Sequence, residues 1–278
     1  MRSKGKAAGI IIILLTFFTF CGFMAMMVAP REKTAEEGGL RIIYNPEKDG
    51  KAGQAHLILA EVNSTDAPDS LQVNLYYYRD SQFKKSELYR LGGTDYFGVE
   101  IPGGPLGSRI YYYLEAVDGA GNRVVLPETA TDDFQTEYDY FKVRFEGKAS
   151  FILLVLHIVL MMAALFLLIH ALYYAIYYLQ TGEKSDPLVI TVNWGIITFF
   201  ITGFPIGWVI EKQVLGNYWE GIPFGWDITD SKTLIILVLW LIFIILRRAG
   251  KISLKTFARW VIINTIITIL LFLIPHSL

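Results

Sequence analysis

The sequence predicts a mixed fold, in which an antiparallel β-sandwich ectodomain precedes an α-helical transmembrane bundle of five spans. Hydrophobic residues make up 53% of the 278 residues, more than an ordinary soluble domain contains. Long apolar runs recur along the chain, and crossing a bilayer takes about 20 helical residues. Between the first two runs lies a polar, tyrosine-rich segment of domain size. Alternation of apolar and polar residues within this segment indicates strands.

Five apolar runs are the candidate spans. Four of them reach or approach the required length of about 20 residues. The fourth in chain order is short, and it spans a bilayer only if its helix begins near Thr229. Pro205, between Gly203 and Gly207, lets the third run kink. The runs occupy residues 10–29, 151–179, 188–210, 233–246 and 258–274.

These runs divide the chain into three parts. Residues 1–30 form an N-terminal transmembrane anchor, residues 31–149 the extracytoplasmic sandwich domain, and residues 150–278 a four-helix transmembrane domain with an ordered outer loop at 211–232. The first run is longer than the roughly 7–15 apolar residues of a signal peptide, so we expect an uncleaved anchor, with a cleaved signal as the alternative. Cys21, the only cysteine, lies in this run, so the sandwich domain contains none.

Basic residues beside the runs predict the orientation in the membrane. Lysine and arginine in short loops stay on the cytoplasmic side. Here they gather before the first run, between the second and third, and between the fourth and fifth. We therefore expect a multi-pass protein of the cytoplasmic (inner) membrane, with a cytoplasmic N-terminus and with residues 31–149 and the C-terminus extracytoplasmic. The basic residues are Arg2, Lys4, Lys6, Lys184, Arg247, Arg248, Lys251, Lys255 and Arg259.

Strand patterns are clearest at residues 71–78 and 109–116, where apolar residues alternate with polar residues or tyrosine. Five further candidates are separated by turns rich in glycine and proline, and about seven short strands in roughly 100 residues favour a two-sheet antiparallel sandwich. Tyrosines fall on both faces of the two clearest strands. One face belongs to the core, and the other is either an exposed strip for a partner or packs under a neighbouring loop. These tyrosines are Tyr76, Tyr77, Tyr78, Tyr111, Tyr112 and Tyr113.

Two runs carry a resemblance to a known family: YFGVEIP at 96–102 and RIYYYLEAVDGAGN at 109–122. They resemble the last strands of prokaryotic Ig-like or fibronectin type III-like modules, in which a strand ends in Ile-Pro, a tyrosine-rich strand closes with Ala-x-Asp, and a Gly-Asn turn follows. The resemblance covers about residues 40–147 and implies the sandwich fold. It implies no activity, because such modules serve as spacers, adhesion surfaces and docking modules. The 118–122 turn is either an ordinary tight turn or a cation loop.

Two histidines, His157 and His170, fall inside the second run. Ionisable residues within spans are costly and point to function. Thirteen residues rotate a helix by about 220°, so the two side chains face different sides. His276 follows the fifth run and shares the outer leaflet with His157, which makes a His157–His276 haem b site one alternative. The commoner interpretation is that the histidines are buried and bonded to neighbouring carbonyls or tyrosines, and we predict no cofactor.

The outer loop at 211–232 is rich in glycine, tryptophan and carboxylates. Tryptophans at this level fit the interfacial aromatic belt, and Asp230 is expected to cap the fourth helix. Neither role accounts for Glu220 or Asp227, so we expect the loop to bind a partner or a cation. The candidate residues are Trp219, Glu220, Trp226, Asp227 and Asp230.

No phosphate-binding glycine loop, zinc-ligand spacing, nucleophile elbow or haem-attachment cysteine pair occurs in the sequence. The leading expectation is therefore a non-catalytic membrane subunit or scaffold that presents an Ig-like domain outside the membrane and assembles with a membrane or periplasmic protein. One alternative is an electron-transfer subunit holding haem b or quinone near the outer leaflet. Another is a component of a cation or proton pathway. The bilayer is an expected partner, and nucleic acid is not.

Overall fold

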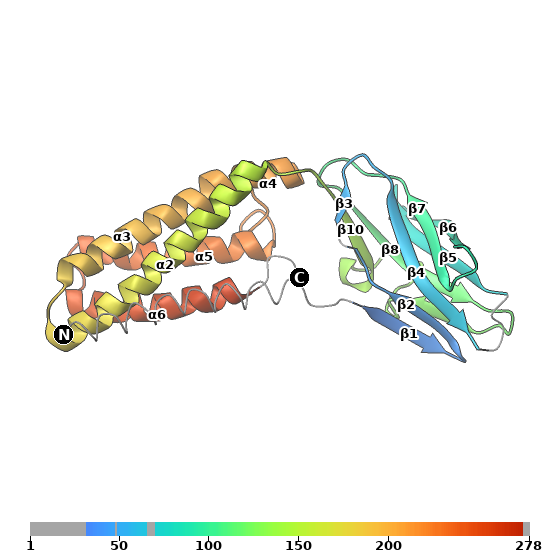
Figure 1. The fold of residues 1–278 in the computed structure, drawn as a ribbon, viewed down its shortest axis with the longest axis horizontal. Helices are drawn as coiled ribbons and strands as arrows, with labels where there is room; N and C mark the ends of the chain where they lie inside the picture. Colours follow the sequence, from blue (N-terminus) through green and yellow to red (C-terminus); the bar gives the residue numbers. More distant parts are fainter. Residues whose placement is uncertain (1–31, 48, 66–69, 275–278) are drawn as a thin grey trace. The chain divides into compact units, whose positions relative to one another are not determined.

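The structure, a computed structural model, describes residues 32–47, 49–65 and 70–274. The chain divides into two compact units (Figure 1). The strand-rich unit runs to Lys148 and includes Val214–Gly216, and the helical unit contains Ala149–Gln213 and the chain from Asn217 onward. The first predicted span, with Cys21, lies outside the described residues, as does His276.

In the described residues of the strand-rich unit there are ten strands: β1 (Lys33–Glu37), β2 (Leu40–Tyr44), β3 (Asp49–Lys51), β4 (His56–Ser64), β5 (Gln72–Arg79), β6 (Gln82–Arg90), β7 (Tyr96–Ile101), β8 (Arg109–Val117), β9 (Arg123–Leu126) and β10 (Phe141–Glu146). They belong to a single sheet in the order β1-β2-β4-β7-β6-β5-β8-β10-β3, and β9 pairs with β8. The β10–β3 pairing is parallel, and the other pairings are antiparallel. A short 3-10 helix, η1 (Glu137–Asp139), precedes β10.

β6 makes this sheet continuous. Residues 82–88 of β6 pair with β5, and then Tyr89 and Arg90 pair with Gly98 and Phe97 of β7. A strand that changes partner along its length joins two halves of a sheet that would otherwise be separate, so the sheet curls around its core. The strand-rich fold is confirmed. The sheet is mixed and continuous, and the two-sheet antiparallel sandwich is not confirmed.

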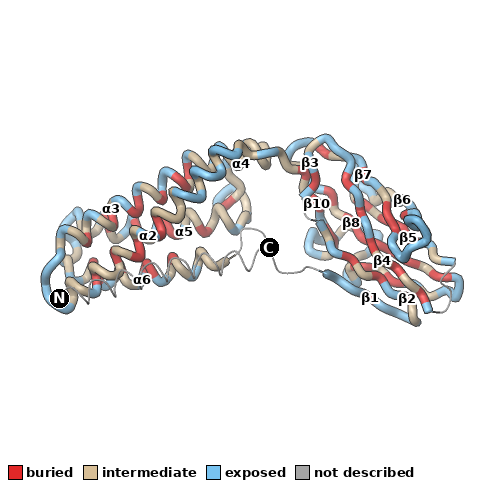
Figure 2. Tube along the Cα trace, viewed as in Figure 1, coloured by how far each residue is buried: buried red, intermediate tan, exposed pale blue. Residues whose placement is uncertain are grey.

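The core of this unit lies on the inner face of the curled sheet. Along β4, Ile58, Ala60 and Val62 are buried, as the period of two requires (Figure 2). Tyr112 is also fully buried, and its hydroxyl is 2.7 Å from that of Tyr44. Burial raises the pKa of Tyr44 to about 12, so the phenols pair in their neutral forms.

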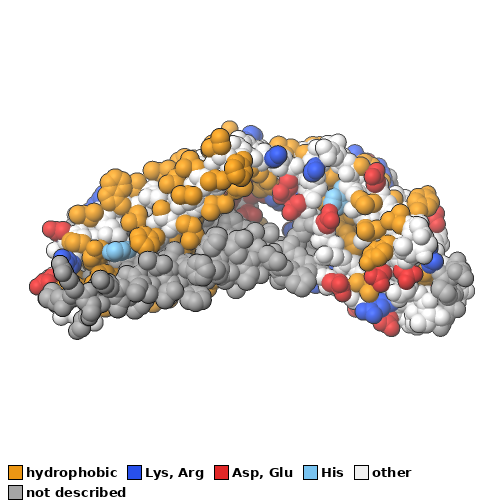
Figure 3. Space-filling view, in the orientation of Figure 1, with side chains coloured by type: hydrophobic (Ala, Val, Ile, Leu, Met, Phe, Trp, Pro, Cys, Tyr) orange, Lys and Arg blue, Asp and Glu red, His pale blue; other side chains and the backbone are white. Residues whose placement is uncertain are grey.

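The helical unit consists of α2 (Phe151–Thr181), α3 (Ser185–Ile201), the π-helix η2 (Thr202–Ile206), α4 (Gly207–Leu215), α5 (Ile228–Arg248) and α6 (Leu254–Leu273). Among the described residues, four helices are long and apolar enough to cross a membrane: Phe151–Thr181, Ser185–Leu215, Ile228–Arg248 and Leu254–Leu273. The short predicted span reaches 21 residues because its helix begins at Ile228. Hydrophobic side chains cover much of the face of this unit in Figure 3.

Small residues let the spans approach one another closely. Gly195 of α3 lies against α2, where an added Cβ would come within 2.8 Å of the Leu168 side chain. Between α5 and α6, the Trp240 indole donates a 3.0 Å hydrogen bond to the Thr268 hydroxyl. Close backbones and interhelical hydrogen bonds are how helices associate in lipid. The predicted kink of the third span is the π-turn at η2, which contains Pro205.

Candidate functional site

The predicted outer loop has a defined backbone because two carboxylates hold it. Asp230 Oδ2 accepts hydrogen bonds from the amides of Glu220 (2.7 Å) and Gly221 (3.1 Å). Asp227 Oδ1 accepts from the Asp230 amide at 3.0 Å and is the N-cap of α5. The prediction that Asp230 caps this helix is therefore wrong. Helix α5 begins one turn earlier, and from its first turn the Asp230 side chain points back toward the loop amides.

Glycines make the tight course of this loop possible. An added Cβ would come within 2.1 Å of the Glu220 carbonyl at Gly225 and within 2.5 Å of Asp230 Cβ at Gly221. The Glu220 carbonyl accepts from the Asp227 amide at 3.0 Å, which closes the loop across its base. Most side chains would break this arrangement, so the loop has a fixed shape.

The remaining charged groups of this region are also engaged. The carboxyl groups of Glu211, on α4, and Asp230 are hydrogen-bonded to each other. Glu220 accepts from the Asn217 side chain at 3.0 Å. Lys232 is buried and donates to the carbonyl of Ile274 at the end of α6 (2.5 Å). Over the residues that the structure describes, no group of three or more His, Cys, Asp or Glu side chains is arranged to hold a metal ion.

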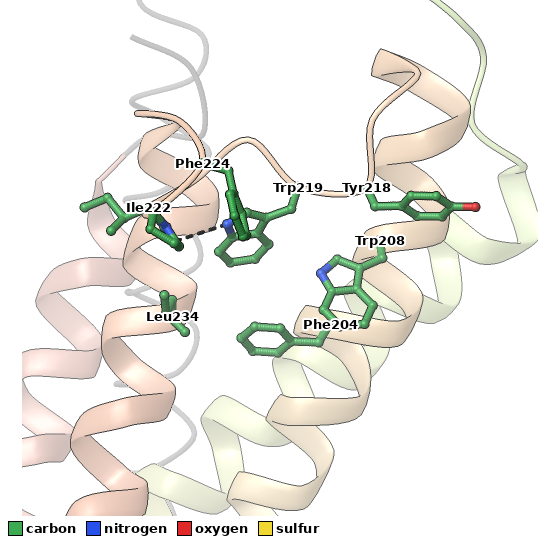
Figure 4. A pocket seen from close by; sticks show the side chains of 8 residues that line it. Phe204, Trp208, Tyr218, Trp219, Ile222, Phe224 and Leu234 are labelled. Carbon is green, nitrogen blue, oxygen red and sulfur yellow. Dashed lines mark hydrogen bonds between the residues drawn. The ribbon is translucent and has the colours of Figure 1, made fainter.

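The two predicted tryptophans have different surroundings. Trp219 packs inward, with its ring stacked on Phe204 at 5.6 Å and its indole N–H donating to the Ile222 carbonyl at 3.2 Å. Trp226 is 87% exposed, and nearby Phe224 is 85% exposed. Figure 4 shows Trp219 on the wall of a cavity of about 430 Å³, which we call the aromatic pocket. It is lined by Phe204, Trp208, Tyr218, Trp219, Ile222, Pro223, Phe224 and Leu234.

The two span histidines do not meet. His157 Nδ1 lies 3.1 Å from the carbonyl of Thr202, whose hydroxyl donates to the His157 carbonyl at 3.1 Å. His170 makes its described ring contacts with residues of its own helix, including Tyr174 at 4.7 Å and Phe166 at 5.9 Å. A histidine bonded to a carbonyl is the arrangement that the commoner interpretation predicts for His157. The His157–His276 haem site remains a prediction, since His276 lies outside the described residues.

The outward tyrosine face of the sheet packs under a neighbouring segment. Phe134 stacks on Tyr78 with ring centres 4.5 Å apart. The Tyr111 hydroxyl donates to Glu137 at 2.7 Å, and the Tyr113 hydroxyl donates to Asp132 at 2.5 Å. Burial first, and the bonded carboxylate second, raise the pKa of Tyr111 to about 12 and that of Tyr113 still further. Of the two predicted alternatives, the covered face is the one found.

The turn at 118–122 is an ordinary tight turn. The Asp118 carboxylate accepts from the amides of Ala120 and Asn122, from the Asn122 side chain and from the Ser64 hydroxyl, at 2.8–3.0 Å. The bond from the Asn122 side chain, followed by that from Ser64, lowers the pKa of Asp118. These donors use the oxygens that a cation would need.

A second surface, absent from the predictions, lies on the outward face of β4, β7 and the end of β6. Pairing brings its members together, because Gly98 lies opposite both Leu59 and Tyr89. A Cβ added to Gly98 would touch the side chains of Leu91 (3.4 Å) and Leu57 (3.6 Å), so these leucines cover the glycine. We call this surface the sheet patch. Its members and their exposed fractions are Leu57 51%, Leu59 41%, Tyr89 68%, Leu91 44% and Tyr96 45%.

Acidic side chains surround the sheet patch. Glu100 lies opposite Leu57, and Glu61 lies opposite Tyr96. Beside them is a hollow of about 270 Å³, lined by Glu32, Ile43, Tyr44, Asn45, Glu47, Leu59, Glu61 and Tyr96. Figure 3 shows hydrophobic side chains among red carboxylate side chains on the strand-rich unit. The surface therefore combines an apolar centre with an acidic rim.

The chain matches no protein-family model and no curated protein. Its function is therefore argued from its own residues. One sequence signal marks the sheet patch in retrospect. β4 carries large apolar residues at both phases of its alternation, with Ile58 and Val62 on one face and Leu57 and Leu59 on the other. Such a strand is expected to be covered on both faces, and among residues 32–47, 49–65 and 70–274 only one face is covered.

Proposed function

We propose that this protein is a non-catalytic, multi-pass membrane subunit or scaffold that presents its strand-rich unit outside the cytoplasmic membrane and binds a protein partner through the sheet patch. The proposed topology has five spans, a cytoplasmic N-terminus and an extracytoplasmic C-terminus. It rests on the basic residues beside the spans. The proposed strand-rich unit is an Ig-like docking module, in keeping with the motifs at 96–122.

The sheet patch is the observation that carries this proposal. Soluble domains rarely leave several large apolar side chains exposed side by side, and such patches mark interaction surfaces. Tyrosines such as Tyr89 and Tyr96 are enriched among residues that dominate binding energy. The acidic rim favours a positively charged partner, because complementary charge speeds encounter and excludes wrong partners. The partner therefore has an apolar centre surrounded by lysine or arginine.

The described residues give no comparable support to the alternatives. A haem held by two histidines needs ligands that meet, and the two described span histidines do not: His157 lies against Thr202, and His170 lies among the rings of its own helix. For the cation alternative, the described parts of the chain contain no group of three or more His, Cys, Asp or Glu side chains arranged to hold a metal ion. The exposed Phe224 and Trp226 of the outer loop offer a second contact for a partner in the same membrane.

The test compares two exposed tyrosines of the strand-rich unit in the full-length protein in its own membrane. Tyr89, in the sheet patch, is 68% exposed, and Tyr138, on η1, is 87% exposed. A photo-crosslinking residue at Leu59 first identifies the partner. We expect Tyr89→Lys to reduce recovery of that partner at least tenfold and Tyr138→Lys to leave it unchanged. If Tyr89→Lys accumulates normally and keeps the partner, the sheet patch is not the docking site.

The topology is tested separately. Reporter fusions at Lys184 and Lys251 should give a cytoplasmic signal, and a fusion after Leu278 should give an external one. A cytoplasmic signal from the last fusion would contradict the five-span arrangement.

A further inference from the structure

The aromatic pocket lies where two candidate spans end. Phe204 and Trp208 belong to the span Ser185–Leu215, and Leu234 belongs to the span Ile228–Arg248. The outer loop supplies the remaining walls through Tyr218, Trp219 and its neighbours. Figure 4 shows these side chains around an open space between the two helices. At about 430 Å³ the space is within the range of ligand sites.

The walls are suited to hydrocarbon. All eight side chains are aromatic or aliphatic, apart from the polar atoms of three rings. The Trp219 N–H is bonded to the Ile222 carbonyl, and the Tyr218 hydroxyl points away from the space in Figure 4. The Trp208 indole nitrogen is turned toward it. The pocket thus offers one hydrogen-bond donor on an otherwise apolar wall.

One lysine, Lys212, lies beside Tyr218 at the rim of the pocket. The Lys212 ammonium lies over the Tyr218 ring, 5.0 Å from its centre. Aromatic rings and lysine at the end of a span mark the level of the lipid headgroups. Phe200 and Val209, on the same span, are 45% and 42% exposed, so the pocket is continuous with the apolar surface that faces lipid. Toward the end of the span, the apolar surface is therefore followed by the pocket and then by Lys212.

We infer that the aromatic pocket binds one acyl chain of a bilayer phospholipid, with the ester carbonyl at the Trp208 N–H and the phosphate at Lys212. A hydrocarbon chain fits the apolar walls, a carbonyl accepts from the single donor, and an anion complements the cation on the rim. The bilayer supplies this ligand from the side on which the spans are exposed. The bound acyl chain contacts the wall that the outer loop contributes and thereby holds Phe224 in place.

Native mass spectrometry of the full-length protein in mild detergent, titrated with phosphatidylglycerol, measures this binding. We expect one lipid to be retained by the wild type. Leu234→Trp fills the pocket and should weaken retention at least tenfold. Ile235→Trp is the matched control, because Ile235 is the next residue of the helix, 45% exposed, and does not line the pocket. Lys212→Gln should weaken retention about fivefold. Equal retention by the wild type and Leu234→Trp overturns the proposal, as does equally tight binding of diacylglycerol, which lacks the phosphate.

A second measurement does not depend on how the pocket-filling variant folds. Phosphatidylglycerol with brominated acyl chains should quench tryptophan fluorescence of the wild type in nanodiscs. Trp219→Phe should reduce the quenched fraction, whereas Trp240→Phe should not, because Trp240 is 1% exposed in the helical core. An unchanged quenched fraction in Trp219→Phe overturns the proposal. Neither measurement includes the protein partner. A negative result would therefore overturn the lipid proposal without bearing on the docking role proposed for the sheet patch.

Discussion

The strand-rich unit has two outward surfaces rich in large apolar side chains, and the described part of the chain covers only one of them. Over β5 and β8, Phe134 and the residues around it lie against the tyrosines and bond their hydroxyls. Over β4 and β7, the sheet patch has no such cover, and its five members are at least 41% exposed. The difference shows that this chain has a means of covering an apolar face. This contrast is the basis of the proposal that an external partner binds the sheet patch.

Phe134→Ala should produce the largest loss of stability. It removes the ring that stacks on Tyr78 and Tyr140, whose ring centres are 4.5 and 5.1 Å away. Phe134 is half-buried, so the lost burial should cost about 1–2 kcal/mol, and the lost ring stacking should cost about 0.5–1.5 kcal/mol more. Urea unfolding of the full-length protein, followed by hydrogen exchange in β5 and β8, measures the effect. A change below about 0.5 kcal/mol would show that the segment does not stabilise the face it covers.

Asp230→Ala should cause the next largest loss of stability. Asp230 holds the outer loop in place, so this substitution tests that loop as Phe134→Ala tests the segment over the tyrosines. The substitution leaves the amides of Glu220 and Gly221 without their acceptor, and because both bonds are part-buried, each should cost about 0.5–1.5 kcal/mol. Hydrogen exchange at residues 218–226 should rise strongly. Asp230→Asn is the control, since its amide oxygen can still accept both bonds. Asp227→Ala should cost about 1 kcal/mol as the loss of an N-cap.

Leu59→Lys should barely change stability, and this contrast with Phe134→Ala is the sharpest test of the comparison. Leu59 is 41% exposed, and substitutions on an exposed surface stay within about 0.5 kcal/mol. The free energy of unfolding should match that of the wild type. The partner first identified by crosslinking should no longer be recovered with this variant. A large destabilisation would mean that the sheet patch is covered within the unit after all.

The smallest predicted effect is a dependence of stability on pH, which arises from His56 on the inner face of β4. Burial lowers the pKa of His56, outweighing the opposing influence of Glu47 and Asp49, and its Nε2 has no hydrogen-bond partner in the described residues. The unfolded chain takes up a proton near pH 6.5, where folded His56 remains neutral. The stability that His56 contributes is therefore complete above about pH 6.5 and declines below it. Unfolding measured between pH 7 and 5 should show this slope, and His56→Phe should flatten it.

Local patterns predicted most of the elements. The alternations at 71–78 and 109–116 became β5 and β8, and the apolar runs after residue 150 became four helices of spanning length. Periodicity reports on one segment at a time, so it succeeds where the neighbouring residues decide the structure. The continuous sheet depends instead on β6 pairing first with β5 and then with β7. Neither pairing leaves a mark in the sequence of β6.

The site was harder to predict for similar reasons. Asp227 and Asp230 are both suitable N-caps, three residues apart, and only the start of α5 decides between them. Phe134 lies in a polar stretch shortly before Tyr138 and Tyr140, and nothing in this spacing indicates that it covers the tyrosines. The sheet patch looks like the second face of a fully buried strand. In each case the deciding contact is between residues far apart in the chain.

The π-turn at η2 has a geometric consequence for the whole outer end of the helical unit. In it the Thr202 carbonyl accepts from the Gly207 amide, five residues on, which adds one residue to the turn. Each residue advances a helix by about 100°, so side chains after Ile206 are rotated by about that angle from the course of an uninterrupted helix. Trp208, which lines the aromatic pocket, and Glu211, which is bonded to Asp230, both follow this turn and take the rotation with it. Deleting one residue from 202–206 would barely alter the length or hydrophobicity of the span, yet it would turn both side chains away from their partners.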